Sequence, residues 1–393
     1  MPPLRILHVT PYFSDAWAYG GIPRVAGTLA RGLARRGHRV TVCTTDARDE
    51  SSRLAAREIR TPDGVVVHVF PNISNRLAYR LQLFLPLGFS KFLEQHAADF
   101  DVAHVHACRN MPGAIATHHL RRAGVPYVLA PNGTAPIIER RRIAKRLFDV
   151  MLGRRVVSNA ARIIAVSDAE RRQLQQLGIP DTTIRVIPNP IDLDEFGQPV
   201  RRGAFRQRWS LGTDRVVLFL GKLTPRKRVD VLIRAFARIT HSHTRLVIAG
   251  NDMGSGPALK ALVRSHGLEG RTIFTGLLRG VERVEALADA DVLVYPSEHE
   301  IFGLVPVEAL LAGTPVIVSD DSGCGEVIST TGGGQVIPAG DVRALAGAIE
   351  GALERRPDAM EMADAATRAR SLYGDAAVCA RLERLYTEIV ERP

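Results

Sequence analysis

The chain has 393 residues, a length that is too great for one ordinary hydrophobic core and predicts two domains. Hydrophobic residues make up 46% of it and charged residues 24%, which is typical of a soluble globular protein. No apolar run approaches the length of a membrane span, and the first apolar segment follows Met1 almost directly. We therefore expect neither a spanning helix nor a signal peptide.

Positive charge is concentrated in the first half of the sequence. Residues 1–190 contain 27 Lys and Arg against 14 Asp and Glu, which gives +13, and the remaining residues contain 25 against 27, which gives −2. No recognised nucleic-acid motif accompanies this charge. An anionic membrane face or a phosphorylated lipid acceptor explains the basic half at least as well as nucleic acid does.

The cysteines indicate a reducing environment. They are isolated in the sequence, with neither the spacing of metal ligands nor that of a disulfide framework, at Cys43, Cys108, Cys324 and Cys379. This usage is typical of a cytoplasmic protein.

Apolar runs predict an α/β first half. The expected strands lie at residues 5–10, 39–44, 65–69, 101–106, 127–130, 162–166 and 183–187. A helix at about 24–36 connects the first two strands, an order typical of doubly wound sheets, which bind ligands at the carboxyl ends of their strands. The loop before this helix lacks G-x-G-x-x-G, but Gly20 and Gly21 would let a phosphate approach the backbone. A flexible surface loop is the equal alternative.

Two apolar segments of the first half have two interpretations each. Residues 77–93 predict a helix that is buried on the sheet and broken at Pro86, or an insertion that touches a membrane. Residues 138–160 predict an amphipathic helix with a basic side that is either a solvated face or a membrane-binding surface. Its apolar side holds Ile143, Leu147, Val150 and Met151, and its basic side holds Arg141, Arg142, Lys145 and Arg146.

Polar side chains near the ends of the fourth and fifth strands are candidates for a site. His104 and His106 lie on one face of the fourth strand. His106 ends that strand, so we predict a functional role for His106 and a structural one for His104. Asn132 follows the fifth strand in the turn P-N-G-T. His118 and His119 lie in a predicted helix and are expected to be surface or packing residues.

The segment I-P-N-P-I-D at residues 187–192 combines prolines with turn formers and predicts a hinge. We therefore place one domain at residues 1–190 and a second at residues 191–374. The second half repeats the α/β pattern, with strands expected at residues 216–220, 246–249, 272–274, 291–295 and 316–319. A last helix is expected in the segment 375–393.

Basic residues follow the first strand of the second half, in the run G-K-L-T-P-R-K-R. Lys222 and Lys227 would lie at the carboxyl edge of the sheet, where they could contact a diphosphate. The alternative is that they are solvated surface residues. Gly250 and Gly276 follow the next two strands and would allow a ligand to come close, although such glycines often serve only as turns.

The stretch 295–314, Y-P-S-E-H-E-I-F-G-L-V-P-V-E-A-L-L-A-G-T, joins two predicted strands through a loop and a short helix. The helix is expected to begin near Gly303, and its first N–H groups would form an anion site. These N–H groups belong to Phe302, Gly303 and Leu304. Glu300 and Glu308 flank the site, and carboxylates bind hydroxyls rather than phosphates. The combination indicates a diphosphate between two hydroxyl-rich groups, as in a nucleotide-sugar.

The same stretch resembles the signature of the retaining glycosyltransferases of family 4, which have the GT-B fold. The matching residues are Glu300, Phe302, Gly303, Leu304 and Glu308. The resemblance covers nearly the whole chain. It implies that the pair Gly20-Gly21 meets the donor's phosphate and sugar, and that the loops at Gly250 and Gly276 line the nucleotide base. The family usually has arginine where Lys222 stands.

The chain departs from the family pattern in two further places. The family often presents a histidine near the acceptor where Asn132 stands, so the other candidates for that polar group are His106, His118 and His119. The family commonly has glycine where Pro190 stands, which predicts a stiffer hinge. By resemblance, the C-terminal helix crosses back to the first domain.

The resemblance implies two Rossmann-like doubly wound domains that face a cleft, with the acceptor in the first domain and the donor in the second. The implied activity is transfer of a hexose from a UDP- or GDP-sugar to a glycan or lipid-linked acceptor, with retention of configuration, in cell-surface polysaccharide or glycolipid synthesis. Lys222 and Lys227 would stabilise the leaving diphosphate, Glu300 would orient the sugar, and Glu308 would hold the ribose.

No metal or other cofactor is expected, because no D-x-D pair follows a strand where it could hold an ion. The expected location is cytoplasmic, with peripheral attachment to the inner face of the plasma membrane as an additional hypothesis. The alternatives are a catalytically silent nucleotide-sugar-binding partner of a membrane glycan assembly and, on the same fold, a nucleotide-sugar epimerase or a phosphorylase. The two-glutamate signature argues against both enzyme alternatives.

Overall fold

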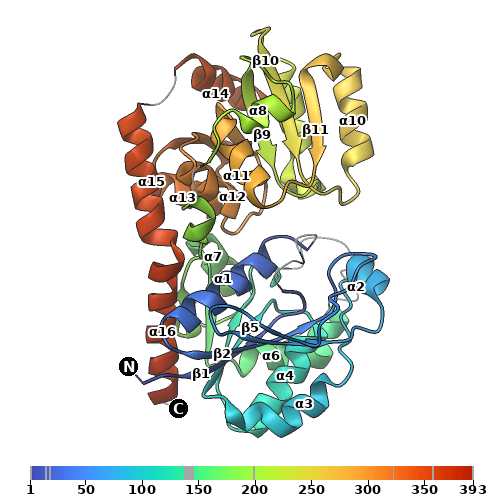
Figure 1. Ribbon diagram of the computed structural model, residues 1–393, viewed down its shortest axis with the longest axis vertical. Helices are drawn as coiled ribbons and strands as arrows, with labels where there is room; N and C mark the ends of the chain where they lie inside the picture. Colours follow the sequence, from blue (N-terminus) through green and yellow to red (C-terminus); the bar gives the residue numbers. More distant parts are fainter. Residues whose placement is uncertain are drawn as a thin grey trace. The chain divides into compact units, whose positions relative to one another are not determined.

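Two sheets organise the chain, one in each of two units (Figure 1). The first unit comprises residues 1–190 and 375–393, and the second comprises residues 191–374. The computed structural model describes residues 2–13, 16, 19–136, 146–197, 200–321, 323–355 and 358–391. The division falls directly after Pro190, and the C-terminal helix is grouped with the first unit.

The first unit is built on an eight-stranded sheet. Its strands are β1 (Arg5–Val9), β2 (Arg39–Thr45), β3 (Glu58–Arg60), β4 (Val66–Phe70), β5 (Val102–His106), β6 (Tyr127–Ala130), β7 (Arg162–Ala165) and β8 (Ile184–Val186). The order across the sheet is β3-β4-β2-β1-β5-β6-β7-β8, and all neighbours are parallel except β3 and β4. Inner strands of a parallel sheet are covered on both faces, which explains their apolar runs.

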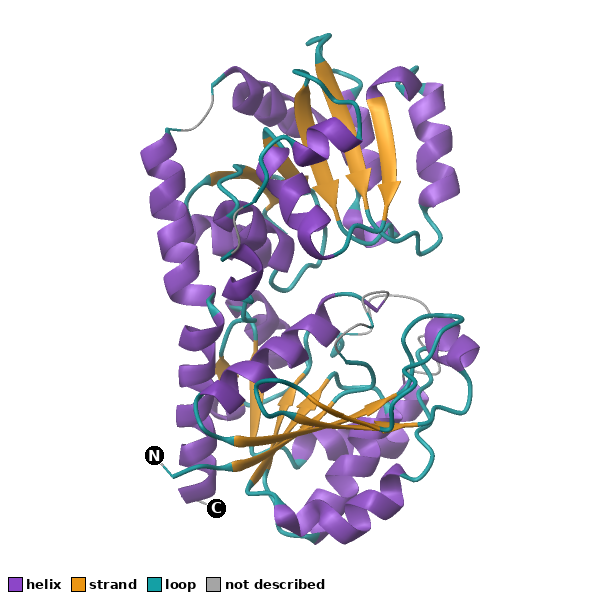
Figure 2. Ribbon diagram, viewed as in Figure 1, coloured by secondary structure: helices purple, strands orange, loops and turns teal. Residues whose placement is uncertain are grey.

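Helices cover both faces of this sheet (Figure 2). They are α1 (Gly21–Arg35), α2 (Asn75–Leu81), α3 (Phe89–His96), α4 (Met111–Arg122), α6 (Arg154–Ser158), α7 (Asp168–Gln176) and α16 (Asp375–Glu391). Three of these helices begin after a residue type that is preferred as an N-cap. The side chains of Ser74, Asn110 and Ser167 each accept a hydrogen bond from a backbone N–H in the first turn.

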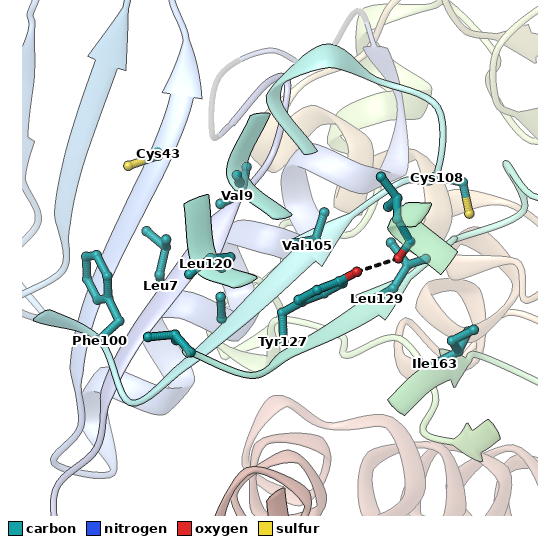
Figure 3. Packing of buried hydrophobic residues seen from close by; sticks show 14 of the residues in the cluster. Leu7, Val9, Cys43, Phe100, Val105, Cys108, Leu120, Tyr127, Leu129 and Ile163 are labelled. Atoms are coloured by element: carbon teal, nitrogen blue, oxygen red, sulfur yellow. Dashed lines mark hydrogen bonds between the residues drawn. The ribbon is translucent and has the colours of Figure 1, made fainter. Parts of the chain in front are cut away.

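A buried cluster joins the strands to α3 and α4 (Figure 3). It includes Leu7, Val9, Phe89, Leu93, Val105, Leu120 and Leu129. Tyr127 belongs to this cluster, and its hydroxyl donates a 2.7 Å hydrogen bond to the carbonyl oxygen of Val156, which satisfies the buried polar atom. Because side chains alternate along a strand, the intervening residues of β1 and β5 face the other side of the sheet, towards α1 and α16.

The second unit is built on a six-stranded parallel sheet. Its strands are β9 (Arg215–Leu220), β10 (Thr244–Ala249), β11 (Thr272–Gly276), β12 (Val292–Tyr295), β13 (Val316–Ser319) and β14 (Gly334–Ile337), in the order β11-β10-β9-β12-β13-β14. Its helices are α8 (Ala204–Arg208), α9 (Val229–Phe236), α10 (Gly256–Ser265), α11 (Gly280–Asp289), α12 (Leu304–Leu311), α13 (Gly323–Thr331), α14 (Val342–Glu354) and α15 (Ala359–Tyr373).

Both sheets reverse their strand order at one position. In the first unit the reversal lies between β1 and β5, and in the second it lies between β9 and β12. Doubly wound sheets bind their ligands at the carboxyl ends of the strands beside such a reversal. The predicted α/β class with two doubly wound sheets is thus confirmed, and each unit offers one position for a site.

The prediction that residues 77–93 form a helix buried on the sheet and broken at Pro86 is confirmed only after the break, where Phe89 and Leu93 of α3 belong to the buried cluster. The region forms α2 and α3, and Gln82 ends α2 in a left-handed conformation with φ 53°. Three leucines between or at the ends of these helices are exposed, namely Leu81, Leu83 and Leu87. The apolar run therefore does not mark one buried face, since only Phe84, Phe89 and Leu93 of its large side chains are almost fully buried.

Two edge strands were not predicted from the sequence. The three residues of β3 are exposed, and so are the first three of β14. Short, exposed edge strands carry no apolar run, so periodicity gives no signal for them. Among the described residues, no helix is long and apolar enough to cross a lipid bilayer.

Candidate active site

The reversal in the second sheet brings together the loop after β9 and the loop after β12. The first loop contains Lys222 and the short 3₁₀ helix Pro225–Lys227, and the second contains Glu300. Lys227 Nζ donates hydrogen bonds to the Glu300 carboxylate and to the Tyr295 hydroxyl. The side chains of Lys227 and Glu300 are 10% and 16% exposed, so their ion pair is largely shielded from water.

Burial and charge act in opposite directions on this ion pair. Burial alone would lower the pKa of Lys227, but the Glu300 carboxylate and the Tyr295 hydroxyl together outweigh burial, and the pKa is raised. Burial alone would raise the pKa of Glu300, but the charges of Lys227, Arg226 and Lys222 lower it. Both groups are therefore charged, and the loop after β9 adds two further positive charges close to the carboxylate.

Backbone contacts also join the two loops. The Glu298 N–H donates to the Arg226 carbonyl oxygen at 2.9 Å, and the Arg228 guanidinium pairs with the Glu298 carboxylate. Arg228 and His299 have φ values of 48° and 54°, a left-handed conformation that L-residues rarely adopt. Strain of about 1 kcal/mol or more per residue persists only where the surroundings enforce it, which is typical of functional loops.

Two helices begin beside Glu300. Gly303 precedes α12 with φ 80°, and a Cβ at this position would overlap Cys324 Sγ. The Gly323 N–H at the start of α13 donates to the Glu300 carbonyl oxygen at 2.6 Å. The prediction that a helix begins near Gly303 is confirmed, and the close packing on Cys324 is a physical reason for glycine there.

The neighbours of Gly303 differ in exposure. The Phe302 side chain is buried, and its ring packs edge-on against Tyr373 with centroids 5.3 Å apart. Its side chain therefore stabilises the core, and only its backbone could contact a ligand. Leu304 is half-buried at the first position of α12.

Glu308 is not where a free ligand-binding carboxylate would be expected. It lies in the middle of α12 with no exposed surface, and its carboxylate pairs with Arg283 of α11. Arg283 also pairs with Glu195. The sequence analysis missed Arg283, because nothing local indicates that a residue of α11 faces Glu308. A contact between Glu308 and a ribose remains a prediction.

The glycine after β10 serves the protein's own backbone. A Cβ on Gly250 would overlap the carbonyl oxygen of Gly221, so the loops after β9 and β10 approach each other directly. The Gly250 N–H donates to the carbonyl oxygen of Gly276 at 2.8 Å, and Gly276 itself has φ 73° with open space around it. Turn geometry thus accounts for both glycines, and their role beside a nucleotide base remains a prediction.

The glycine pair of the first unit lies at the start of α1. Gly20 has φ 100° and precedes the helix, and Gly21 is its exposed first residue. Residues 14, 15, 17 and 18 of the same loop lie outside the described part of the chain. The pair is at the carboxyl edge of the first sheet, as expected, and its contact with a phosphate remains a prediction.

His106 is the last residue of β5 at the carboxyl edge of the first sheet, as expected, but its side chain is buried. Its ring has no exposed surface and stacks on His104 with centroids 4.2 Å apart. Its Nε2 lies 3.1 Å from Nδ1 of His8, which the sequence analysis did not single out. Burial lowers the pKa of His8 to about 3 and the pKa values of His104 and His106 well below the usual range. A contact of His106 with an acceptor remains a prediction.

Asn132 lies beside these histidines at the wall of a small cavity. The cavity is lined by His104, His106, Ala130 and Asn132 together with residues of α1, β7, the 187–189 segment and α16. Asn132 adopts φ 51°, and its Oδ1 is buried without a hydrogen-bond partner among the described residues. Its amide nitrogen donates to the Ala130 carbonyl oxygen at 3.3 Å. The turn thus aims a polar atom inwards.

Glu170 holds this turn in place and was missed by the sequence analysis. The carboxylate is fully buried and accepts the Gly133 N–H at 2.6 Å and the Val166 N–H at 2.9 Å. Burial raises the pKa of Glu170 to about 7, although both N–H groups act to lower it. The residue connects the turn that carries Asn132 to the end of β7.

His118 and His119 are surface or packing residues of α4, as predicted. His118 is exposed, and His119 Nε2 lies 2.8 Å from Ser90 Oγ. Neither ring lines the cavity beside Asn132.

Solved structures with the same fold define the class of protein. A sucrose-phosphate synthase from Thermosynechococcus elongatus superposes with a TM-score of 0.79 and 21% identity, covering 99% of this chain and 100% of the other. The Anabaena protein HepE, in complex with UDP and glucose, superposes with a TM-score of 0.78 and 20% identity. That match covers 98% of this chain and 100% of the other. The chain has the GT-B fold of glycosyltransferases.

Family models and curated relatives identify the family. The model "Glycosyltransferase Family 4" matches residues 19–195, and "Glycosyl transferases group 1" matches residues 202–369. A D-inositol 3-phosphate glycosyltransferase of Kineococcus radiotolerans is 32% identical over 80% of this chain and 76% of the relative. A GDP-mannose-dependent alpha-mannosyltransferase of Mycobacterium tuberculosis is 31% identical over 79% of this chain and 78% of the relative. The chain belongs to glycosyltransferase family 4.

Proposed function

We propose that the chain transfers a hexose from a nucleoside diphosphate sugar to a glycan or lipid-linked acceptor, with retention of configuration. One relative named for GDP-mannose and a structural neighbour in complex with UDP support a nucleotide-sugar donor. Retention is an inference from the family resemblance. The acceptor class follows from the basic first half, because a phosphorylated lipid or an anionic membrane surface complements positive charge.

The ion pair of Lys227 and Glu300 carries this proposal. It lies at the strand-order reversal of the second sheet, next to Lys222, Arg226 and the first residues of α12. A departing diphosphate gains negative charge, and preorganised cations with little exposure to water stabilise such charge more than solvent does. In this proposal Lys227 exchanges Glu300 for the diphosphate, and Glu300 is then available to a sugar hydroxyl.

The proposed chemistry requires no metal at the diphosphate. Two lysines and Arg226 supply positive charge from one loop, and the N-terminal end of α12 adds its dipole. Arg226 was not selected in the sequence analysis, although the run R-K-R contained the signal. It could provide the paired N–H groups that Lys222 lacks compared with the arginine usual in the family.

Attachment to a membrane surface is the second part of the proposal. Two exposed apolar groups lie in the first unit, one at Ile73, Leu77, Leu81, Leu83 and Leu87 and the other at Leu147, Val150 and Met151. Arg76, Arg80 and Arg146 lie within or beside these groups in the sequence. Exposed apolar side chains next to basic ones are typical of interfacial binding to anionic lipid. Residues 137–145, with Arg141, Arg142 and Lys145, lie outside the described part of the chain.

Donor hydrolysis tests the proposed function. The purified chain is incubated with UDP- and GDP-sugars, and free nucleoside diphosphate and released sugar are measured over time. We expect slow hydrolysis of one donor. The same sugar attached to the other nucleoside diphosphate should not be hydrolysed. Binding of a donor without release of nucleoside diphosphate would instead favour the silent binding partner. Recovery of an epimerised sugar would favour an epimerase.

A further inference from the structure

Three histidines meet where the first sheet reverses its strand order. The register of β1 and β5 pairs His8 with His104, and His106 follows two residues later on the same face. The ring centroid of His8 lies 5.1 Å from the ring centroid of His104 and 5.3 Å from that of His106. Because the two strands are paired in this register, the three side chains leave the sheet next to one another on the same face.

The cluster is closed to solvent and leaves nitrogen atoms without partners. His8, His104 and His106 are 0%, 1% and 0% exposed. Within the described residues, no hydrogen-bond partner is found for His8 Nε2, His104 Nε2 and His106 Nδ1. Buried polar atoms nearly always have a partner, so one unpaired nitrogen on each of three adjacent rings requires an explanation.

The charge state and the outer contacts suit metal ligands. Neutral imidazole offers a lone pair to an ion, and full burial favours the neutral form of all three rings. The hydroxyl of Tyr386 on α16 lies 2.6 Å from His104 Nδ1. A ligating histidine usually has such a partner on its second nitrogen, which orients the ring and leaves the other nitrogen free for the ion.

Space for an ion and a further ligand is present next to the rings. The cavity lined by His104, His106 and Asn132 has a volume of about 10 Å³, close to the smallest that holds one water molecule. Asn132 Oδ1 is also unpartnered among the described residues and lies at this cavity. A water molecule there could complete a four-coordinate ion and be held by the Asn132 amide oxygen.

We propose that His8, His104 and His106 bind one zinc ion inside the first unit. One ligand atom from each ring lies within 4.8 Å of the others, and this is the only group of three metal-binding side chains found in the described parts of the chain. Three nitrogen ligands and a water molecule in tetrahedral geometry are typical of zinc. The ion would join β1 to β5 and, through Tyr386, to α16. This site departs from the expectation that the chain holds no metal ion, which was based on the absence of a D-x-D pair after a strand.

Binding requires the rings to rearrange, because His104 and His106 are stacked with an interplanar angle of 8° and their nitrogen atoms must turn towards one ion. Two nitrogens on one tetrahedral zinc lie roughly 3.3 Å apart, given zinc–nitrogen bonds of about 2.0–2.1 Å, so the ligand atoms must move closer. The hydrogen bond between His8 Nδ1 and His106 Nε2 must also open if either nitrogen is a ligand. Because the site is buried, we expect the ion to enter while the unit folds rather than by exchange into the folded chain.

Refolding with cobalt tests the proposal. The full chain, free of any polyhistidine tag, is unfolded with a chelator and then refolded with Co²⁺, which gives four-coordinate sites a strong visible absorption. After desalting, we expect about one cobalt per chain. If the chain is unfolded and refolded a second time with Zn²⁺, zinc should replace the cobalt. His8→Gln and His104→Gln should lower the metal content roughly tenfold or more. His118→Gln, at an exposed histidine of the same unit, should leave it unchanged.

Two results would overturn the proposal. One is wild-type protein that regains its native circular dichroism with far less than one metal per chain, in which case the cluster is a hydrogen-bonded network of neutral imidazoles. The other is full metal content in a folded His8→Gln or His104→Gln chain, which would place the ion elsewhere. If those variants fail to fold, the unfolding midpoint of the wild type decides. It must rise when Zn²⁺ replaces chelator during refolding.

Discussion

At Lys227, one side chain takes part in two interactions that exclude each other. In the structure its ammonium is bound to Glu300 and Tyr295, and in the proposed reaction it is bound to the diphosphate. Lys227→Ala should therefore reduce turnover on the order of 10²-fold, as the loss of one preorganised charge stabiliser does elsewhere. Donor hydrolysis at saturating donor measures this. Arg264→Ala, which removes an exposed cation from the same unit, is the matched control, and equal turnover in both variants would remove Lys227 from the mechanism.

Glu308 and Glu300 are predicted to have different effects on nucleoside diphosphate binding. If Glu308 holds the ribose and Glu300 the sugar, Glu308→Ala weakens binding of the free nucleoside diphosphate and Glu300→Ala leaves it almost unchanged. Glu308→Ala should also destabilise the second unit by about 3–5 kcal/mol, because it removes one partner of the buried Arg283. Calorimetric titration and chemical denaturation separate the two effects. A destabilised variant with normal binding would assign Glu308 to folding alone.

Glu170 predicts a pH dependence of stability. Its pKa rises from an ordinary value of 4.5 to about 7 on folding, so the unfolded chain releases this proton first as the pH increases. The free energy of unfolding should then fall by about 3 kcal/mol between pH 4.5 and pH 7 and stay level above. Glu170→Gln should lack this contribution. Denaturation of both proteins at several pH values checks it, and parallel curves would contradict it.

At the scale of elements, two glycines inside helices differ in the space around them. A Cβ at Gly32 of α1 would lie 2.5 Å from Cys379 Sγ of α16, whereas a Cβ at Gly347 of α14 would meet nothing within 4 Å. Gly32→Ala should therefore destabilise the first unit by about 1–3 kcal/mol through overpacking. Gly347→Ala should stabilise its helix by about 0.5–1 kcal/mol. Chemical denaturation measures both, and a stabilising Gly32→Ala would show that α1 and α16 can separate freely.

At the scale of the whole molecule, the uneven charge predicts reversible binding to anionic membranes. Each basic residue near an anionic surface contributes about 1 kcal/mol, so four of them support salt-sensitive attachment without permanent anchoring. Binding to vesicles should appear with anionic lipid, disappear with neutral lipid and weaken as salt increases. Co-sedimentation measures it.

Charge reversal identifies the segment responsible. Changing Arg141, Arg142, Lys145 and Arg146 to glutamate should abolish vesicle binding and leave donor hydrolysis intact. The matched control is Arg264→Glu, in the nearly neutral second half. Wild-type protein that ignores anionic vesicles at low salt would favour a soluble acceptor, or a protein partner for these arginines.

The sequence by itself determined the α/β class, most inner strands and the start of a helix after Gly303. Those features are local: a buried parallel strand is a continuous apolar run, and a helix that begins after Gly303 needs a glycine there. Even so, exposed edges such as β3 left no pattern. The exposure of Leu77, Leu81, Leu83 and Leu87 in the apolar run 77–93 was not predicted, because hydrophobicity does not reveal whether a neighbouring element covers a segment.

Only the tertiary structure decided which side chains meet. Arg283 and Glu308 are 25 residues apart, Lys227 and Glu300 are 73 apart, and His8 and His106 are 98 apart. Periodicity covers a few residues, whereas these contacts depend on the strand order of each sheet, which brings β9 beside β12 and β1 beside β5. Burial follows from the same packing. For this reason the sequence could nominate Lys227 and Glu300, but it could not predict that they form an ion pair or that three histidines share the core of the first unit.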